Sequence, residues 1–80
     1  MSELAVPQYL TLEEQLGQRI QSARNTFKIS QRELAERAGL TQAVVSKIEA
    51  GTANPTLSTV QKIADALYMH PSITLRIKHQ

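Results

Sequence analysis

The stretch that decides the fold is QRELAERAGLTQAVVSKIEAG, which occupies residues 31–51 of the 80-residue chain. Its first half places three apolar residues on one helical face, namely Leu34, Ala35 and Ala38. Gly39 then supplies the left-handed conformation that closes a helix and turns the chain sharply. In the second half, the spacing of Val45 and Ile48 directs both toward a core. The stretch therefore predicts two short helices, 31–38 and 42–50, joined by a tight turn.

A further helix is predicted before this pair, over residues 12–25. Thr11 and Glu14 form a capping box, which satisfies backbone amides at a helix start. Behind the box, one helical stripe collects the apolar residues Leu12, Leu16, Ile20, Ala23 and Phe27. Ser30 and Glu33 form a second capping box at the start of helix 31–38.

A fourth helix is predicted after the pair. Thr41 is the N-cap candidate for helix 42–50, and Pro55 keeps the residue before it out of the helical region. Thr56 or Ser58 then caps the last helix. Its stripe consists of the apolar residues Leu57, Val60, Ile63, Ala64 and Leu67.

The ends of the chain do not continue this pattern. Residues 1–10 have no clean period and contain Pro7, so they are interpreted as an arm that either binds a partner or is disordered. Residues 11–69 hold the four helices, and 70–80 form a tail in which apolar and polar residues alternate from Ile73 to Lys78. This alternation predicts a strand, with a disordered or helix-like tail as the alternative. The predicted fold class is all-α, a compact four-helix domain with a short C-terminal strand.

Composition excludes several classes of protein. There is no cysteine, and His70 and His79 lack metal-ligand spacing, so no disulfide, metal or other cofactor is expected. No signal peptide or membrane span is apparent, so a cytoplasmic protein is expected. Without a Ser/His/Asp set or a phosphate-binding glycine loop, neither an enzyme nor a small-molecule site is expected. Residues 15–49 hold six basic against three acidic residues, which suits an anion-binding surface.

The pattern within residues 31–51 closely resembles the Cro and lambda-repressor type of helix-turn-helix, often called the XRE family. The matching positions are Gln31, Leu34-Ala35, Gly39, Thr41-Gln42, Val45-Ser46-Lys47-Ile48-Glu49 and Gly51. Each residue taken singly also occurs in ordinary helical proteins, and only the joint spacing is specific. The likeness covers about Leu16 to Leu67, four of the family's usual five helices. It implies a lambda-repressor-like fold whose helix 42–50 enters the major groove of double-stranded DNA.

The resemblance assigns contacts with bases and phosphates to particular residues. Base reading is implied for Gln42, Ala43, Ser46 and Lys47. Gln42 stands where the family reads adenine, Ala43 suits a thymine methyl, and Lys47 suits guanine or a phosphate. Phosphate contacts are implied for Gln31, which also braces Gln42 in the family, and for Arg32, Ser46, Asn54, Thr56 and Ser58.

Two further features have structural roles. Arg24 and Glu49 match a family ion pair that ties the first helix to the end of the third. The predicted strand replaces the family's usual fifth helix and resembles the tail of HipB-type antitoxins, where it pairs with a second subunit. Such a ribbon would satisfy both strand edges and bury Ile73, Leu75 and Ile77 against the fourth helix, so a homodimer is expected.

Two functions follow from the resemblance. The first is a sequence-specific transcriptional repressor that binds a palindromic operator as a homodimer. The second is mainly a protein-interaction module, an antitoxin that neutralises a toxin partner and also represses its own operon. Eighty residues leave no room for a separate effector domain, which favours an antitoxin or a small phage-type repressor. The neighbouring gene would discriminate between them.

Overall fold

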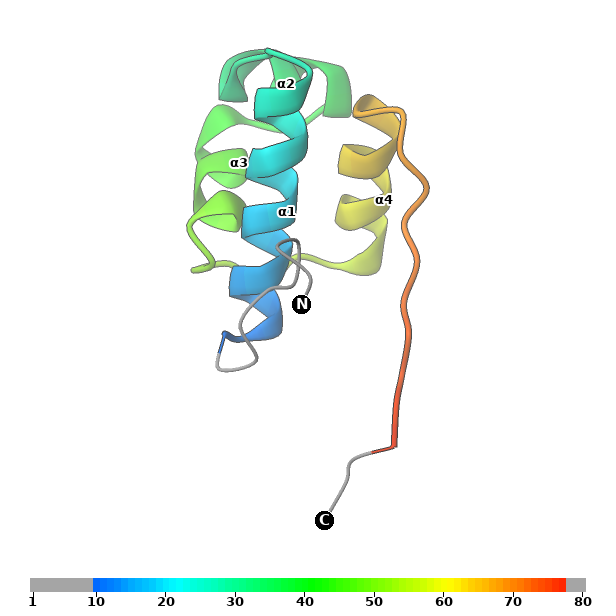
Figure 1. The fold of residues 1–80 in the computed structure, drawn as a ribbon. Helices are drawn as coiled ribbons and strands as arrows, with labels where there is room; N and C mark the ends of the chain where they lie inside the picture. The colour runs from blue at the N-terminus through cyan, green and yellow to red at the C-terminus, as the bar shows by residue number, and fades with distance from the viewer. Residues whose placement is uncertain (1–9, 78–80) are drawn as a thin grey trace.

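The computed structural model describes residues 10–77, which contain four α-helices and no strand (Figure 1). The helices are α1 Leu12–Thr26, α2 Gln31–Ala38, α3 Gln42–Glu49 and α4 Leu57–Ala66. In Figure 1, α3 and α4 lie on opposite sides of the long α1, and α2 lies at one end of it. The all-α prediction is therefore confirmed, with helix ends within one residue of those predicted for the first three helices. None of these helices has the length and apolar character needed to cross a membrane.

Hydroxyl side chains cap all four helices at their N-termini. Thr11 accepts a hydrogen bond from the Glu14 amide at 3.0 Å, and the Glu14 carboxylate accepts one from the Thr11 amide at 2.9 Å. Thr56, rather than Ser58, caps α4. The second predicted capping box is only half formed: Ser30 accepts from the Glu33 amide at 3.0 Å. The Glu33 carboxylate instead binds Arg37 at 2.6 Å, because that cation lies one turn along the same helix face.

The core lies where the four apolar stripes converge. Its fully buried members are Leu34, Val45, Ile48, Ile63 and Leu67. The outer ends of two predicted stripes do not reach it: Leu12 and Leu57 are 78% and 71% exposed. Each is the first residue of its helix and lies beyond the packed region. Phe27 is half-exposed as well, because it follows the end of α1 as the C-cap residue.

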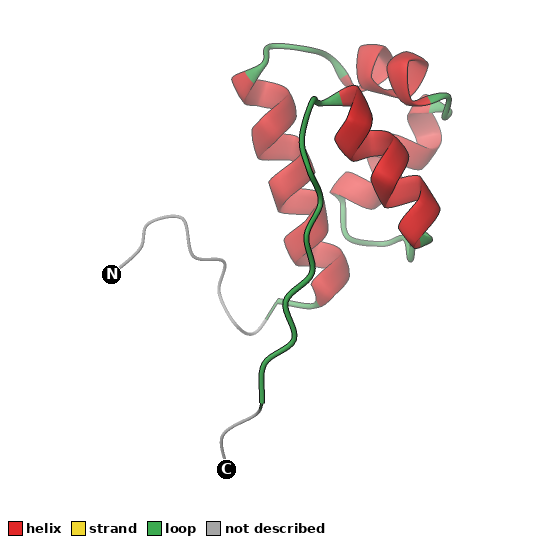
Figure 2. Cartoon of the chain, turned by 90° about the vertical axis from the view of Figure 1, so that its right-hand side faces the viewer, coloured by secondary structure: helices red, strands yellow, loops and turns green. Residues whose placement is uncertain are grey.

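The predicted strand is absent from the described part of the tail. Tyr68 adopts a left-handed conformation, with φ 57°, directly after α4. Residues 70–77 then run as a loop alongside α1 and α4 and past their ends (Figure 2). Ile73, Leu75 and Ile77 are 71%, 92% and 93% exposed, so the single chain does not show the burial on the fourth helix that was expected of a dimer. A strand needs a ladder partner, and no other strand exists in residues 10–77. Residues 1–9 of the predicted arm, and Lys78, lie outside the described residues.

Candidate nucleic-acid interface

The helix expected to read DNA bases is α3, and its position is set by its two ends and by its apolar side. Gly39 takes the left-handed conformation, with φ 72°, and Leu40 packs against the core. Thr41 then accepts a hydrogen bond from the Val44 amide at 3.2 Å and starts the helix. Because Val45 and Ile48 are buried, the opposite side of α3 is exposed. That side carries the four predicted base-reading residues, Gln42, Ala43, Ser46 and Lys47.

The polar ends of these reading residues are not used within the domain. No hydrogen bond between residues 10–77 involves the side chains of Gln42, Ser46 or Lys47. The Lys47 carbonyl, in contrast, accepts from the backbone amide of Thr52 at 3.1 Å and from its hydroxyl at 3.2 Å. The loop after α3 is thus tied back to the helix, while the side chains in front stay available for a ligand.

Behind α3, a three-residue cluster joins α1, α2 and α3. Arg24 donates to both carboxylate oxygens of Glu49, at 2.7 and 3.0 Å, and to the Ile29 carbonyl at 3.0 Å. The side chains are 13% and 4% exposed. The hydrogen bond to Glu49 and the attraction of its charge raise the pKa of Arg24, against the lowering effect of desolvation. Arg24 therefore keeps its charge at any ordinary pH.

Gln31 joins the same cluster rather than standing apart. Its amide nitrogen donates to Glu49 Oε1 at 3.0 Å, so one carboxylate holds both Gln31 and Arg24. No hydrogen bond between Gln31 and Gln42 occurs among the described residues. The family resemblance suggested the ion pair of Arg24 and Glu49 but not the contact between Gln31 and Glu49.

The other residues expected to contact phosphates lie on exposed surface. Arg32, Asn54, Thr56 and Ser58 are all exposed, near the starts of α2 and α4. Thr56 already uses its hydroxyl oxygen as the cap of α4, accepting from the Thr59 amide at 3.1 Å. Free amides at helix N-termini favour anions, so both helix starts suit a phosphate backbone.

One further exposed residue of α3 was not predicted as a reader. Val44 is 38% exposed although it is apolar. Its position on the helix indicates why: with Val45 and Ile48 at the centre of the buried side, residue 44 falls at the edge of the outward face. A helical projection of the sequence could have found it.

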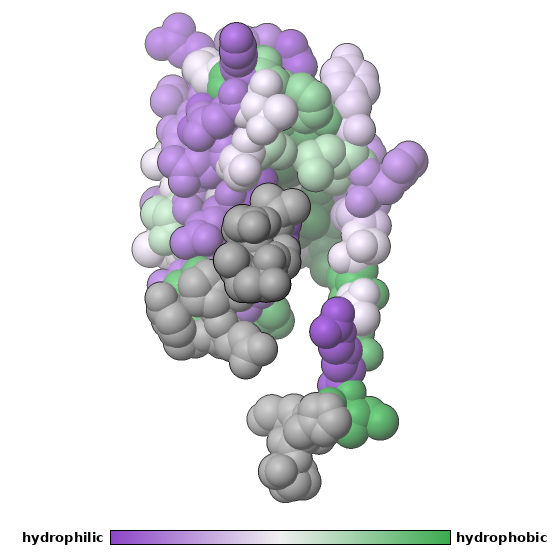
Figure 3. Space-filling model, in the orientation of Figure 1, coloured by the Kyte–Doolittle hydropathy of each residue, from purple (hydrophilic) through white to green (hydrophobic). Residues whose placement is uncertain are grey.

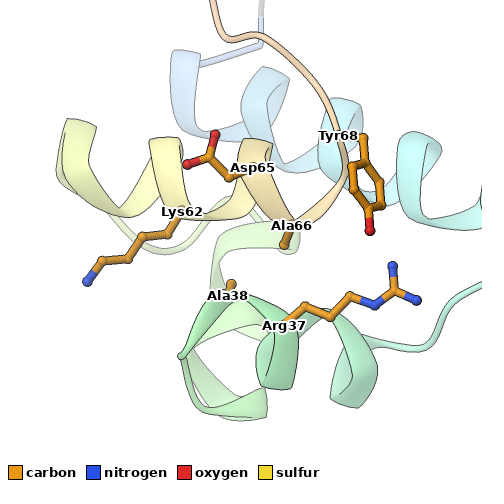
Figure 4. Close-up of a pocket in the computed structure, with 6 residues that line it drawn as sticks. All are labelled: Arg37, Ala38, Lys62, Asp65, Ala66 and Tyr68. Carbon is orange, nitrogen blue, oxygen red and sulfur yellow. The ribbon is translucent and has the colours of Figure 1, made fainter.

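A hollow of the described surface lies away from α3. It has a volume of about 560 Å³ and lies between the C-terminal parts of α2 and α4 (Figure 4). Two of its polar lining residues already have partners: Arg37 binds Glu33, and Asp65 accepts from Gln61 at 2.8 Å. No group of three or more His, Cys, Asp or Glu side chains within residues 10–77 is arranged to hold a metal ion. The surface of α3 remains the candidate site.

Comparison with known proteins identifies the family. Residues 20–72 match the helix-turn-helix family. The chain belongs to this helix-turn-helix family, the XRE type. It is 46% identical over 54 residues to an uncharacterized HTH-type transcriptional regulator, y4dL, of Sinorhizobium fredii. It is 42% identical over 52 residues to the immunity repressor protein of Bacillus phage phi105.

A solved helix-turn-helix structure supports the fold over a larger part of the chain. The restriction-modification controller protein C.AhdI of Aeromonas hydrophila superposes with a TM-score of 0.71 at 33% identity, covering 72% of this chain and 84% of that one. The matches to the two curated relatives cover 68% and 65% of this chain but only 28% and 36% of those proteins. The chain thus shares the helix-turn-helix unit with relatives that are much longer.

Proposed function

We propose that this helix-turn-helix protein binds double-stranded DNA sequence-specifically and represses transcription. The observation that carries the proposal is the exposed face of α3, whose polar ends have no partner within residues 10–77. An α-helix with its side chains is about 10–12 Å across, so α3 fits into the major groove, which is about 12 Å wide. The names of the relatives, a transcriptional regulator and an immunity repressor, support the same function.

Some of the exposed residues are placed to contact bases, and others to contact phosphates. Gln42, in the first turn of α3, reads adenine through its N6 and N7, and Lys47 one turn later reads guanine or a phosphate. Gln31, Arg32, Ser46, Asn54, Thr56 and Ser58 hold the phosphate backbone. The contact from Gln31 to Glu49 orients the Gln31 side chain, and its amide oxygen accepts no hydrogen bond from residues 10–77.

Replacing Gln42 with alanine tests the reading role. We expect a loss of about 1–3 kcal/mol on the preferred duplex and relaxed preference at one base position. Gln31→Ala is the matched control, because losing a phosphate contact weakens all duplexes alike. Both are measured by titrating a site selected from random DNA and a panel of its single-base variants. Unchanged discrimination by Gln42→Ala would refute the reading role, and affinity that does not fall with salt would refute the DNA function itself.

The proposal includes a homodimer that binds a palindromic operator. Five of the nine large apolar side chains exposed in residues 10–77 lie on α1, α4 and the tail, namely Leu12, Leu57, Ile73, Leu75 and Ile77. Figure 3 shows apolar surface on α4 and the tail. Between α1 and α4 an apolar groove of about 110 Å³ is lined by Leu16, Ile20, Val60 and Ile63, and Met69 and the first two tail residues, His70 and Pro71, also line it.

A second copy of the chain would remove this apolar surface from water. Paired antiparallel, two tails satisfy each other's backbone groups, which a single tail cannot do. Their apolar side chains then cover the neighbouring grooves. The surface lies on the side of α1 away from α3, so both reading helices stay exposed (Figure 1). Two such helices fit half-sites about 34 Å apart on one face of the DNA.

A substitution that introduces a charge on one side of the tail tests the proposed dimer. In Leu75→Asp, burial of the new carboxylate is unfavourable, so we expect the monomer in sedimentation at concentrations where the parent chain is dimeric. Thr74→Asp is the matched control, because its side chain points to the other side of an extended tail. A dimeric Leu75→Asp variant would exclude the tail from the interface.

The antitoxin alternative uses the same α3 surface and adds a toxin partner. It differs from the repressor in what occupies the apolar tail and groove. Co-expression with the product of the neighbouring gene discriminates between them, because a stable complex that masks a toxic activity would establish the antitoxin.

A further inference from the structure

All four helices end in the same backbone motif. After the last turn, one residue adopts a left-handed conformation, and its amide and the next amide bond to carbonyls three and five residues back. The four left-handed residues are Lys28, Gly39, Gly51 and Tyr68, with φ 59°, 72°, 76° and 57°. Glycine adopts this conformation without steric cost, whereas other residues are strained in it. Two of the four helices therefore end on a residue that is less favourable there than glycine.

Lys28 has a local explanation, and Tyr68 does not. A cation at the C-terminus of a helix is attracted by the carbonyl ends of that helix. The Tyr68 side chain carries no positive charge, and it is 86% exposed, so packing does not retain it either. Its hydroxyl makes no hydrogen bond with another residue of 10–77. A residue held in a strained conformation without such contacts indicates a function for its side chain.

The Tyr68 side chain lies at the edge of the hollow between α2 and α4, which has a volume of about 560 Å³. Figure 4 shows Ala38 and Ala66 at the centre of this hollow. Lys62 lies on one side of the two alanines, and Arg37 and Tyr68 lie on the other (Figure 4). Alanine side chains are small, so another chain can approach closely between the charged groups. Since tyrosine and arginine are enriched among the residues that carry the binding energy of protein interfaces, the hollow suits a segment of a partner protein.

The polar groups of the hollow are mainly hydrogen-bond donors. Lys62 forms no ion pair within residues 10–77, and its ammonium group can only donate. Arg37 donates through one nitrogen to Glu33, which leaves the other N–H groups of the guanidinium for a ligand. Donors on both sides of the alanines require carboxylates on the partner. A peptide can place its carboxylates opposite these cations alone, whereas the regularly spaced phosphates of a nucleic acid would also meet the carboxylates of Glu33 and Asp65.

We propose that this hollow is the docking site for an acidic peptide segment of a partner protein, with Tyr68 as the aromatic anchor and Lys62 and Arg37 as the donors to its carboxylates. The proposal goes beyond DNA binding and dimerisation. No residue that lines the hollow belongs to α3, and none lines the groove between α1 and α4. The chain can therefore bind DNA, a second copy and this partner at the same time.

Tyr68→Gly separates the cost of this residue in folding from its use in binding. Glycine relieves the strain, so the variant should melt at or above the temperature of the parent chain. As the probe for binding, random peptides displayed on phage are selected on the parent chain, and the selected peptides are synthesised with a fluorescent label. They should be rich in Asp and Glu. Tyr68→Gly should bind them more than about ten-fold more weakly, as expected for an interface hot spot.

Two further variants assign the effect to the hollow. Lys28→Gly is the matched control, because it makes the same backbone change in the same motif at the end of α1, away from the hollow. It should bind the peptides as the parent chain does. Lys62→Gln removes only a charge from the other side of the hollow. Binding should then weaken by about two- to five-fold, as for an exposed ion pair, and depend less on salt.

Several results would overturn the docking site. They are a selection that yields no excess of acidic peptides, equal peptide binding by Tyr68→Gly and the parent, and a melting temperature of Tyr68→Gly clearly below that of the parent. The last would mean that the side chain is retained for stability. If Tyr68→Gly weakens binding to a selected DNA duplex as much as binding to the peptides, the hollow belongs to the DNA interface instead. Peptide binding as expected in a chain with no affinity for DNA would refute the proposed DNA function and support the docking site.

Discussion

Glu49→Ala should destabilise the domain by about 3–5 kcal/mol, because it leaves the Arg24 charge without its partner in a largely buried position. Only 13% of the Arg24 side chain is exposed, and two of its hydrogen bonds end on Glu49. The Gln31 amide loses its acceptor as well. The expected measurement is a lower midpoint of urea unfolding with an unchanged slope.

The pair between Arg37 and Glu33 provides the matched control. Its nitrogen-to-oxygen distance of 2.6 Å is close to the 2.7 Å of the buried pair, but its side chains are 40% and 43% exposed. Removal of an exposed pair by Glu33→Ala should therefore cost less than about 1 kcal/mol. A Glu49→Ala effect as small as that of Glu33→Ala would show that the buried cluster is not what holds the three helices together.

The pH dependence of the cluster follows from Arg24. Its pKa is raised in the folded chain by the hydrogen bond to Glu49. A raised pKa means that the stabilisation is complete below the pKa of the unfolded group and is lost only as pH rises through the folded value. Since arginine titrates only at very high pH, this contribution should stay constant across the neutral range.

Gly17→Ala should destabilise the domain by about 1–3 kcal/mol, even though alanine is the better helix former. A Cβ atom at Gly17 would lie 2.5 Å from the carbonyl oxygens of both Ile48 and Glu49. These are backbone atoms at the end of α3, so they cannot rotate away, and α1 and α3 must separate. The separation would also strain the contact between Arg24 and Glu49. The melting temperature and the affinity for DNA should both decrease.

Gly39 provides the contrast for this prediction. It has φ 72°, and a Cβ there would meet nothing within 4 Å. Gly39→Ala should cost about 1 kcal/mol through backbone strain alone, with DNA affinity retained in the folded protein. If Gly17→Ala melts at or above the parent temperature, the close approach of α1 to α3 is not a constraint on the fold.

Much of the fold was predictable from local patterns. The caps Thr11, Ser30 and Thr41 mark helix starts because their hydroxyls satisfy amides only a few residues away. Gly39 marks the turn for a similarly local reason. The buried side of α3 follows from the spacing of Val45 and Ile48, and with it the outward position of Gln42 and Lys47.

Contacts between residues far apart in the sequence were harder to predict. The family resemblance suggested the pair of Arg24 and Glu49, but the Gln31 amide on the same carboxylate appears only when three helix ends meet. Glu33 was expected to complete a capping box with Ser30. Its carboxylate instead binds Arg37, because the guanidinium group and the backbone amide of Ser30 compete for it. The tail shows the same limit: its alternation indicates a strand, yet pairing requires a second strand, which residues 10–77 do not contain.

The sequence by itself determined four helices, their order and the outward face of α3, since these depend on interactions within a few residues. The tertiary structure decided what depends on distant residues: the packing of α1 on α3 at Gly17, the sharing of Glu49 by Arg24 and Gln31, and the exposure of Leu12 and Leu57. The physical reason is that a periodic stripe shows which side of a helix is apolar. It does not show how far along the helix a neighbour lies to cover it.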